Sequence, residues 1–235
     1  MRIAVITPYY KEDISKLKRC HESVVSQTYK STHFFVSDGF PLKKIDSWNV
    51  EHIKLPKAHG DYGDTPRLIG SMSAVTQGFD GICFLDADCW FEQNHIKELV
   101  TLAEEGKVDV VTATRTLRRE DGTVLGVCEG SDGITFCDTN CYLITKTAFG
   151  VLPLWVLKGK EFAVIGDRIL WKEILDRGYR TARCRIPTVN YETLFASHYI
   201  DRGEKPPRNA KVIMYMPETK EYKSVLYRNI KKEKK

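Results

Sequence analysis

One stretch of the chain, Gly81–Phe91 (GICFLDADCWF), constrains the fold more than any other. Its apolar run, Ile82–Leu85, is typical of a short strand that is buried on both faces inside a parallel sheet. Two carboxylates, Asp86 and Asp88, follow directly. Side chains two residues apart in an extended chain point to the same side, so both carboxylates converge just past the carboxyl end of the strand. Open α/β sheets bind their ligands at that edge.

Two converging carboxylates repel each other unless a cation or hydrogen-bond donors lie between them. Magnesium and manganese suit such a place, because these hard ions prefer carboxylates, phosphates and water as ligands. The alternative is that Asp86 and Asp88 only end the strand, since aspartates often form local turns. The order of the surrounding elements favours the cation site.

Apolar runs and amphipathic stretches alternate through the first 114 residues. Strands are expected at residues 3–6, 33–37, 52–55, 81–85 and 108–112, with helices at about 14–25, 65–77 and 93–105. Asp13 is expected to cap the first of these helices and Thr65 the second. This alternation indicates right-handed βαβ units and a mostly parallel sheet flanked by helices.

The pattern changes after residue 114. A hairpin is expected over 115–127, a strand at 141–144 and a helix from Gly166. The sequence therefore predicts a single α/β domain over residues 1–227. Its first half (1–114) has the size of a nucleotide-binding unit, and its second half (115–227) carries a smaller mixed β portion.

The net charge of +5 is uneven, because residues 228–235 hold five basic residues and one acidic residue. Such a basic tail is usually a solvated end, and it can also contact anionic lipid. Nucleic acid is not expected as a partner, because the sequence shows no basic helix and no interleaving of aromatic and basic residues of the sort that RNA-binding proteins have. Seven scattered cysteines without C-x-x-C spacing indicate reduced thiols. The longest apolar patch is too short to span a membrane, and no secretory signal is visible. We expect a cytoplasmic protein, with peripheral contact at the inner membrane face as an option.

Several motifs, in order, resemble glycosyltransferase family 2. They are Ile3–Tyr10 with Cys20–Tyr29 (the family's opening), Phe35–Gly39 (its uridine-binding strand), Phe84–Asp88 (its Asp-x-Asp motif) and Gly166–Arg168 with Leu175–Tyr179 (its acidic catalytic segment). The resemblance covers roughly residues 1–180 and implies the Rossmann-like A-type glycosyltransferase (GT-A) fold. The last 50 residues or so resemble nothing that we can name.

The resemblance implies that residues 1–114 are the nucleotide-binding half and residues 115–227 the acceptor and catalytic half. The nucleotide site would lie at the ends of the first strands. Asp38 would accept the N3–H of uracil, and Thr7, Pro8 and Tyr9 leave the first strand at the same edge, where Tyr9 would stack on the base. Arg67 would hold a phosphate. The structural alternatives are a turn-forming Asp38, a core Tyr9, and an Arg67 that pairs with a neighbouring aspartate.

For the metal site, the resemblance implies that Asp88 binds the divalent cation, Mn²⁺ or Mg²⁺, and that Asp86 contacts the ribose or the metal. The cation would neutralise the departing nucleoside diphosphate. His198 is a candidate further ligand, although a lone histidine is more often structural. Asp138, Thr139 and Asn140 precede a strand and could bond to donor-sugar hydroxyls; their position alone suggests this.

Asp167 is the candidate general base for the acceptor hydroxyl. The family usually has a Glu-Asp pair, whereas this chain has Gly166-Asp167, so one acid is missing and Asp167 could simply be a helix cap. Tyr10 replaces the usual asparagine after the first strand and is assigned no role. The Gln-x-x-Arg-Trp motif of processive synthases is absent from the sequence.

The sequence thus predicts a metal-dependent, non-processive, inverting glycosyltransferase of the hexosyltransferase type. It would move a sugar from a UDP-linked donor to a hydroxyl of an unknown glycan, lipid-linked or protein acceptor. One alternative is a sugar nucleotidyltransferase, although Pro8–Asp13 lacks the Gly-rich phosphate loop of that class. The other is a transferase-like domain that binds nucleotide or protein without catalysis.

Overall fold

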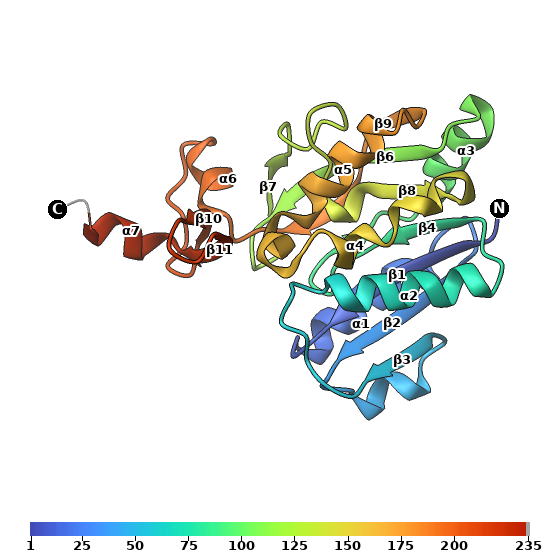
Figure 1. The fold of residues 1–235 in the computed structure, drawn as a ribbon, viewed down its shortest axis with the longest axis horizontal. Helices are drawn as coiled ribbons and strands as arrows, with labels where there is room; N and C mark the ends of the chain where they lie inside the picture. The colour runs from blue at the N-terminus through green and yellow to red at the C-terminus, as the bar shows by residue number, and fades with distance from the viewer. Residues whose placement is uncertain (234–235) are drawn as a thin grey trace.

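The computed structural model describes residues 1–233, with side chains through residue 230. A large twisted sheet forms the body (Figure 1). Its strands are β1 (Ile3–Tyr9), β2 (Ser31–Asp38), β3 (Glu51–Leu55), β4 (Gly81–Phe84), β5 (Trp90–Phe91), β6 (Val110–Arg118), β7 (Val124–Val127), β8 (Tyr142–Thr145) and β9 (Thr181–Glu192). Among the described residues they run in the order β3-β2-β1-β4-β8-β6-β9-β5, with β7 paired to β6.

The sheet is parallel in its first half and mixed in its second. β1 pairs in parallel with both β2 and β4, and β2 pairs in parallel with β3. β8 joins the two halves, because it lies antiparallel between β4 and β6. β6 then pairs in parallel with β9 and antiparallel with β7, so the hairpin expected over 115–127 is confirmed. The α/β architecture and the mixed second half are therefore as the sequence predicts.

Helices cover both faces of the sheet (Figure 1). The described helices are α1 (Ile14–Val25), α2 (Asp64–Thr76), α3 (His95–Gly106), α4 (Leu154–Leu157), α5 (Gly166–Asp176), α6 (Ala196–Ile200) and α7 (Tyr227–Glu233), with 3₁₀ turns η1 (Lys43–Ser47), η2 (Thr139–Cys141), η3 (Lys146–Val151) and η4 (Lys160–Ile165). None of the described helices is long and apolar enough to cross a membrane.

Local chemistry sets the starts of α1 and α2. The Asp13 side chain accepts the Ser15 N–H at 2.8 Å, so the expected cap of α1 is confirmed. The expected cap of α2 at Thr65 is wrong, because α2 already begins at Asp64 after Gly63, whose φ of 87° suits glycine. Asp61 instead accepts both the N–H and the hydroxyl of Thr65, at 3.0 and 2.5 Å. This places the preceding loop tightly over the edge of the sheet.

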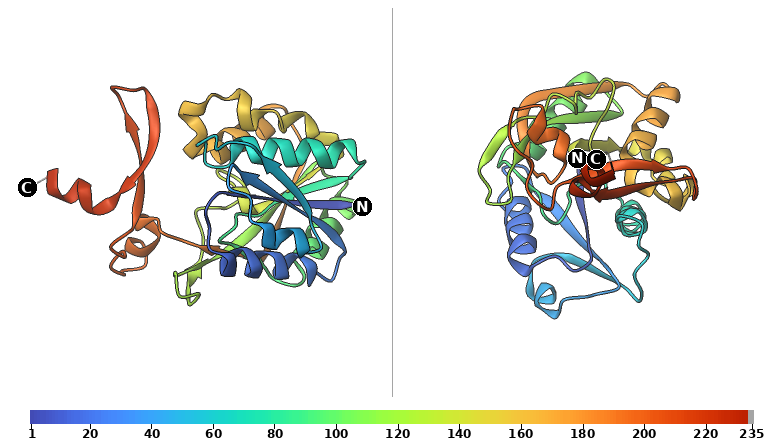
Figure 2. Two further views of the ribbon diagram at one scale, coloured as in Figure 1. Left: turned by 90° about the horizontal axis from the view of Figure 1, so that it is seen from below. Right: turned by 90° about the vertical axis from the view of Figure 1, so that its left-hand side faces the viewer.

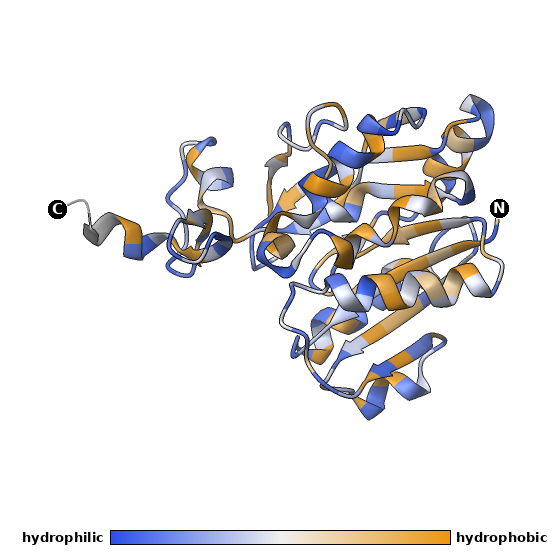
Figure 3. Ribbon diagram, viewed as in Figure 1, coloured by the Kyte–Doolittle hydropathy of each residue, from blue (hydrophilic) through white to orange (hydrophobic). Residues whose placement is uncertain are grey.

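The core lies between the sheet and its helices, where apolar strands run through the centre of the molecule (Figure 3). Gly70 of α2 lets this helix approach closely, because a Cβ there would lie 2.6 Å from the Ile6 side chain and 2.9 Å from that of Val36. Trp155 and Trp171 fill the space beneath α4 and α5. Truncation of a buried tryptophan to alanine typically costs about 3–5 kcal/mol of stability.

A small C-terminal unit projects from the body on the side where β1, β2 and β4 end (Figure 2). Its hairpin consists of β10 (Lys211–Met216) and β11 (Glu221–Leu226). The hairpin touches the body at η4, where the Phe162 and Tyr222 rings lie 6.3 Å apart. Neither this hairpin nor the long strand β9 was expected from the sequence. Of the basic tail, residues 228–233 continue α7, and residues 234–235 lie outside the described part.

Candidate functional site

Two clefts meet at the carboxyl edge of the sheet. The first, of about 470 Å³, lies between the ends of β1 and β2 and the loop over residues 60–63. The second, of about 580 Å³, lies between β4, η2, α5, β9 and the C-terminal hairpin. Four residues line both clefts, namely Tyr62, Arg67, Asp86 and Asp88. The two carboxylates of the Asp-x-Asp motif therefore stand at the boundary between two cavities, each large enough for a small ligand.

Asp86 is held on both sides. Arg67 Nη2 donates to Asp86 Oδ1 at 2.5 Å, and Asn140 Nδ2 donates to Asp86 Oδ2 at 2.9 Å. The Asp86 N–H in turn donates to Asn140 Oδ1 at 2.6 Å. The Arg67 side chain is 8% exposed and that of Asp86 is 29% exposed, so this ion pair is partly buried and Arg67 is already engaged before any phosphate binds. Asp86 is consequently fixed in orientation and its charge is balanced.

A buried lysine extends this cluster toward α4. Lys158 Nζ donates to Asp64 Oδ2 at 2.5 Å, and Asp64 also pairs with Arg67 at 3.7 Å. Burial raises the pKa of Asp64 to about 6, against the opposing effect of Arg67 and Lys158. The Arg67 guanidinium lies 5.1 Å from the Trp155 ring centre. Arg67 therefore pairs with Asp64, as one structural alternative had it, and with Asp86.

Asp88 has no such partner among the described ion pairs. Burial, and then the charge of Asp86, raise the pKa of its carboxyl to about 6. Its main-chain carbonyl accepts a 2.7 Å hydrogen bond from Arg19 of α1. Burial and a neighbouring negative charge destabilise the ionised form of a carboxylate, and a bound cation removes this penalty. Magnesium and manganese are often bound by one or two carboxylates together with substrate phosphates, so Asp88 fits such an ion.

Glu192 at the end of β9 braces the loop that carries Asp88, through two basic residues of α1. Its buried carboxylate pairs with Lys16 and, at 2.9 Å, with Arg19. The Arg19 guanidinium also lies over Trp90, at 4.0 Å from the ring centre. This brace fixes the loop that carries Asp88. The sequence does not reveal it, because Glu192 lies more than a hundred residues from its partners.

Asp167 lies in the first turn of α5 and faces the second cleft. Burial, and then the charge of Asp138, raise the pKa of its carboxyl to about 7. Asp138 comes from the segment before β8 and forms a buried ion pair with Arg115. Asp138 thus provides a second carboxylate near Asp167, although the residue before Asp167 is the glycine Gly166. The sequence could not pair the two acids, because they are 29 positions apart.

Asp138 and Asn140 bond to other protein groups, whereas their position in the sequence suggested contact with donor-sugar hydroxyls. Asp138 Oδ1 accepts the N–H of Asn140 at 3.0 Å and its Nδ2 at 2.9 Å. Asn140 is fully buried and bonds to Asp86, so it positions that carboxylate and does not reach a cleft. Asp138 and Thr139 do line the second cleft.

His198, on α6, lines the second cleft as well. Its Nδ1 lies 2.6 Å from the hydroxyl of Thr193, and its ring lies between those of Tyr191 and Phe195 at 6.2 and 5.9 Å. Burial, and then the charge of Arg115, lower the pKa of His198 to about 4, so it is neutral at physiological pH. Within residues 1–230, however, no three acidic, histidine or cysteine side chains form a preformed metal cluster.

Asp38 faces the first cleft with its carboxylate engaged. Both of its oxygens lie 3.1 Å from the N–H of His59, and His59 Nδ1 lies 2.6 Å from Oδ1. A base that bonds to Asp38 must share it with His59. The arrangement leaves Asp38 at the lining of the cleft, 6% exposed.

The end of β1 contributes to the first cleft unevenly. Pro8 and Tyr9 line it, but Thr7 does not. The Thr7 side chain is fully buried, and its hydroxyl lies 2.8 Å from His33 Nε2, so it faces the core and away from the nucleotide edge. Tyr9 is 2% exposed and its hydroxyl lies 2.7 Å from His52 Nε2. Tyr9 therefore packs largely as a core residue.

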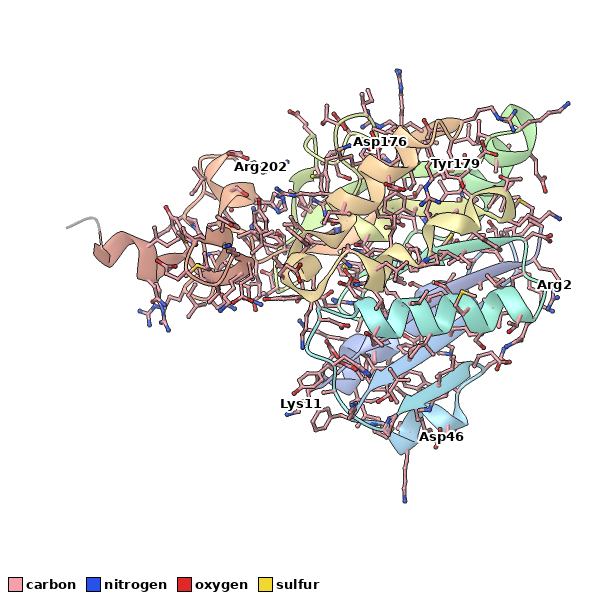
Figure 4. The ribbon with its side chains drawn as sticks, in the orientation of Figure 1. Arg2, Lys11, Asp46, Asp176, Tyr179 and Arg202 are labelled. Atoms are coloured by element: carbon pink, nitrogen blue, oxygen red, sulfur yellow. The ribbon has the colours of Figure 1, made fainter. Side chains whose placement is uncertain are left out.

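An aromatic pair at the rim of the first cleft was not expected. The rings of Tyr10 and Phe40 lie edge to face at 4.8 Å, and Lys11 Nζ lies 4.2 Å from the centre of the Phe40 ring. Both rings are 41% exposed, and Tyr10 lines the cleft. Figure 4 shows Lys11 at this edge of the molecule. Tyr10 thus presents a ring to the cleft, at the position where the family pattern has asparagine.

Comparison with known proteins identifies the class to which this fold and site belong. Residues 4–146, 143 of the 235, match the family model described as glycosyl transferase family 2. The chain therefore belongs to glycosyl transferase family 2. No curated protein is similar enough in sequence to count as a match.

Solved structures of TarS from S. aureus have a similar fold. TarS 1-349 in complex with UDP superposes with a TM-score of 0.62 at 13% identity, covering 86% of this chain and 63% of that chain. TarS 1-349 in complex with UDP-GlcNAc gives a TM-score of 0.64 at 14% identity, covering 82% and 59%. The chain thus spans less than two thirds of these TarS chains. The likeness confirms the GT-A fold that the sequence motifs predicted.

Proposed function

We propose that the protein is a non-processive hexosyltransferase that moves a sugar from a UDP-linked donor to an acceptor hydroxyl with inversion, and that it requires Mn²⁺ or Mg²⁺. One observation carries the proposal: Asp88, at the boundary of the two clefts, and Asp167, in the second cleft, line one continuous space. A leaving diphosphate needs a cation, which one carboxylate can hold, and an attacking hydroxyl needs a second carboxylate as its general base. Membership of glycosyl transferase family 2 supports the same reaction class.

In this proposal the first cleft binds the nucleotide. Asp38 and Pro8 line the position of the base, with Tyr9 beneath it. Asp86, held by Arg67 and Asn140, accepts from the ribose. UDP and UDP-GlcNAc in the TarS structures support a uridine nucleotide as the donor.

The divalent ion, when bound, neutralises charge on the leaving diphosphate, and Asp88 would hold it together with phosphate oxygens. We keep His198 as a further candidate ligand, because it is neutral and lines the second cleft. Asp167 takes the proton of the acceptor hydroxyl. Its raised pKa, near 7, suits a base that must both accept and release a proton near neutral pH.

The acceptor, a glycan, lipid-linked or protein hydroxyl, would enter the second cleft between Asp167 and the C-terminal hairpin. We propose that residues 1–227 act as one domain, because the second cleft combines residues from the two halves. The cysteines of the described chain are all free, which supports a reducing cytoplasmic compartment. Contact with the inner membrane face through the basic tail would bring the enzyme to lipid-linked acceptors.

A panel of nucleotide sugars tests the proposal. We expect UDP-sugars, together with Mn²⁺, to raise the melting temperature more than GDP- or CDP-sugars do. The preferred donor should then be turned over, with transfer to water where no acceptor is supplied. Stabilisation by UDP without any turnover would favour a catalytically inactive binding domain. Formation of a UDP-sugar from UTP and a sugar phosphate would favour the nucleotidyltransferase.

A further inference from the structure

The protein's excess positive charge is confined to one end of the chain. Residues 211–235 hold eight basic and three acidic residues, a net of +5, which equals the net charge of the whole protein. The first 210 residues hold 28 residues of each sign. Of the C-terminal eight basic residues, Lys211, Lys220 and Lys223 belong to the hairpin and its turn, and Arg228 begins the basic tail.

The C-terminal hairpin also exposes apolar and aromatic side chains. Met214 and Tyr215 are 37% and 49% exposed, and the Tyr215 ring packs against Tyr222 across the hairpin at 5.1 Å. Lys223 lies opposite Met214 in the register, and its ion pair with Glu221 is solvent-exposed and contributes little. An isolated two-stranded hairpin is only marginally stable in water. A further surface that covers this hairpin would stabilise it.

The position of the hairpin connects this surface to the second cleft. Lys211, Val212, Ile213 and Ser224 line that cleft, on the side away from the sheet. Figure 2 shows the C-terminal unit projecting from the body, so that the part of the hairpin turned away from the cleft is open to a large partner. Whatever binds there lies next to the cleft that contains Asp167.

We propose that the C-terminal hairpin and the basic tail dock the protein on an anionic phospholipid bilayer, beside the mouth of the second cleft. Tyrosine rings sit well at the headgroup level, and each lysine or arginine near an anionic surface contributes about 1 kcal/mol. Binding at a bilayer surface scales with the buried apolar area together with the attraction to anionic lipid, and the hairpin and the basic tail supply these two contributions. The docking deepens the proposed function, because it presents the acceptor cleft to hydroxyls at a membrane surface, but it does not require catalysis.

Sedimentation of the full chain with lipid vesicles tests the proposal. We expect binding to mixed phosphatidylcholine–phosphatidylglycerol vesicles to be roughly tenfold or more tighter than to phosphatidylcholine alone, and to weaken at high salt. Relative to the unchanged protein, Lys220→Glu with Lys223→Glu should weaken binding to the mixed vesicles by roughly tenfold or more. Met214→Ser with Tyr215→Ser should weaken it even at low salt, where the charges act most strongly.

The matched control reverses two exposed lysines elsewhere, Lys18 on α1 and Lys97 on α3, by Lys18→Glu with Lys97→Glu. The control should bind vesicles like the unchanged protein. UDP affinity, measured on every variant, should stay constant, so a failed docking experiment is distinguishable from a failed assignment of the nucleotide site.

Several results would overturn the proposal. They are no binding to anionic vesicles by folded protein, equal loss of binding in the control, and a concentration-dependent dimer that the hairpin substitutions abolish while vesicle binding persists. Preferential binding of an oligonucleotide over anionic vesicles would also overturn it.

Discussion

The two clefts are built in different ways. The first is assembled from residues 8–88, and its residues follow the ends of three neighbouring parallel strands and one helix. The second combines those strand ends with residues from β6, η2, α5, β9 and the C-terminal hairpin, spread from residue 62 to residue 224. Of the residues that the structure describes, only Tyr62, Arg67, Asp86 and Asp88 belong to both clefts.

This difference suggests a division of labour. A site made from adjacent strand ends depends on local spacing, so any chain with the same βαβ pattern rebuilds it. A site made from distant segments depends on the whole topology and can change its lining with each new connection. We therefore expect substitutions in the first cleft to affect nucleotide affinity, substitutions in the second to affect turnover, and substitutions at the shared boundary to affect both.

The largest effect is expected at the boundary. Asp88→Asn should lower sugar transfer by about 10²- to 10³-fold and abolish the contribution of Mn²⁺ to UDP affinity, because it removes the charge that holds the ion. Steady-state transfer assays and calorimetric titration of UDP with and without Mn²⁺ measure the two effects. Asp176→Asn, at an exposed residue on α5 (Figure 4), is the matched control. Unchanged transfer and unchanged Mn²⁺ dependence in Asp88→Asn would rule out this metal site.

The next effect should be confined to the second cleft. Asp167→Asn should lower kcat by about 10²-fold or more while UDP affinity stays unchanged, because only the general base is lost. In the unchanged protein, transfer should rise with pH to a plateau above about pH 7, the pKa of Asp167, since the base must be ionised. The variant should lose this acid limb. A variant that keeps both the rate and the limb would assign the base to another residue.

The same contrast explains what the sequence could and could not predict. The placement of Asp38, Asp86 and Asp88 at one edge followed from their positions at strand ends and the rule for parallel sheets, whereas Arg67 was assigned from the family resemblance. Their partners did not follow, because Asn140 reaches Asp86 only through the antiparallel insertion of β8 beside β4.

Pairings across the second half depend on topology even more strongly. The ion pair between Arg115 and Asp138 joins β6 to the segment before η2. The brace at Glu192 depends on β9, a 12-residue strand with a mixed burial pattern that gives no clean alternation. The inward orientation of the Thr7 hydroxyl could not be predicted either, because the position of Thr7 in the strand does not show that His33 lies within hydrogen-bonding distance. Residues at the ends of parallel strands could therefore be placed from the sequence, whereas contacts that depend on the order of the strands in the sheet could not.

A smaller effect is expected from the first cleft alone. Asp38→Asn should weaken UDP binding by roughly tenfold and leave kcat unchanged, because it removes one charged acceptor worth about 1.5 kcal/mol without touching the boundary. Discrimination of UDP against CDP should fall by a similar factor. Asp46→Asn is the matched control, since Asp46 lies in the same half but on η1, away from the cleft (Figure 4). A fall in kcat with unchanged UDP affinity would contradict the division between the clefts.

The smallest effect on activity should come from Asp138→Asn, which perturbs the second cleft without removing its base. The charge of Asp138 helps to raise the pKa of Asp167, so its loss should move the acid limb of transfer to lower pH by up to about one unit. At pH 6 the variant should therefore be a few-fold faster, relative to its own plateau, than the unchanged protein.

The same substitution leaves Arg115 buried without its carboxylate, which should cost about 3–5 kcal/mol of stability. The midpoint of the pH profile is the decisive measurement, because it does not depend on the fraction of folded enzyme. A midpoint that stays in place, or moves to higher pH, would show that Asp138 does not act on Asp167. In that case the pKa of Asp167 would not depend on Asp138, and Asp167 alone would set the pH dependence of proton removal from the acceptor.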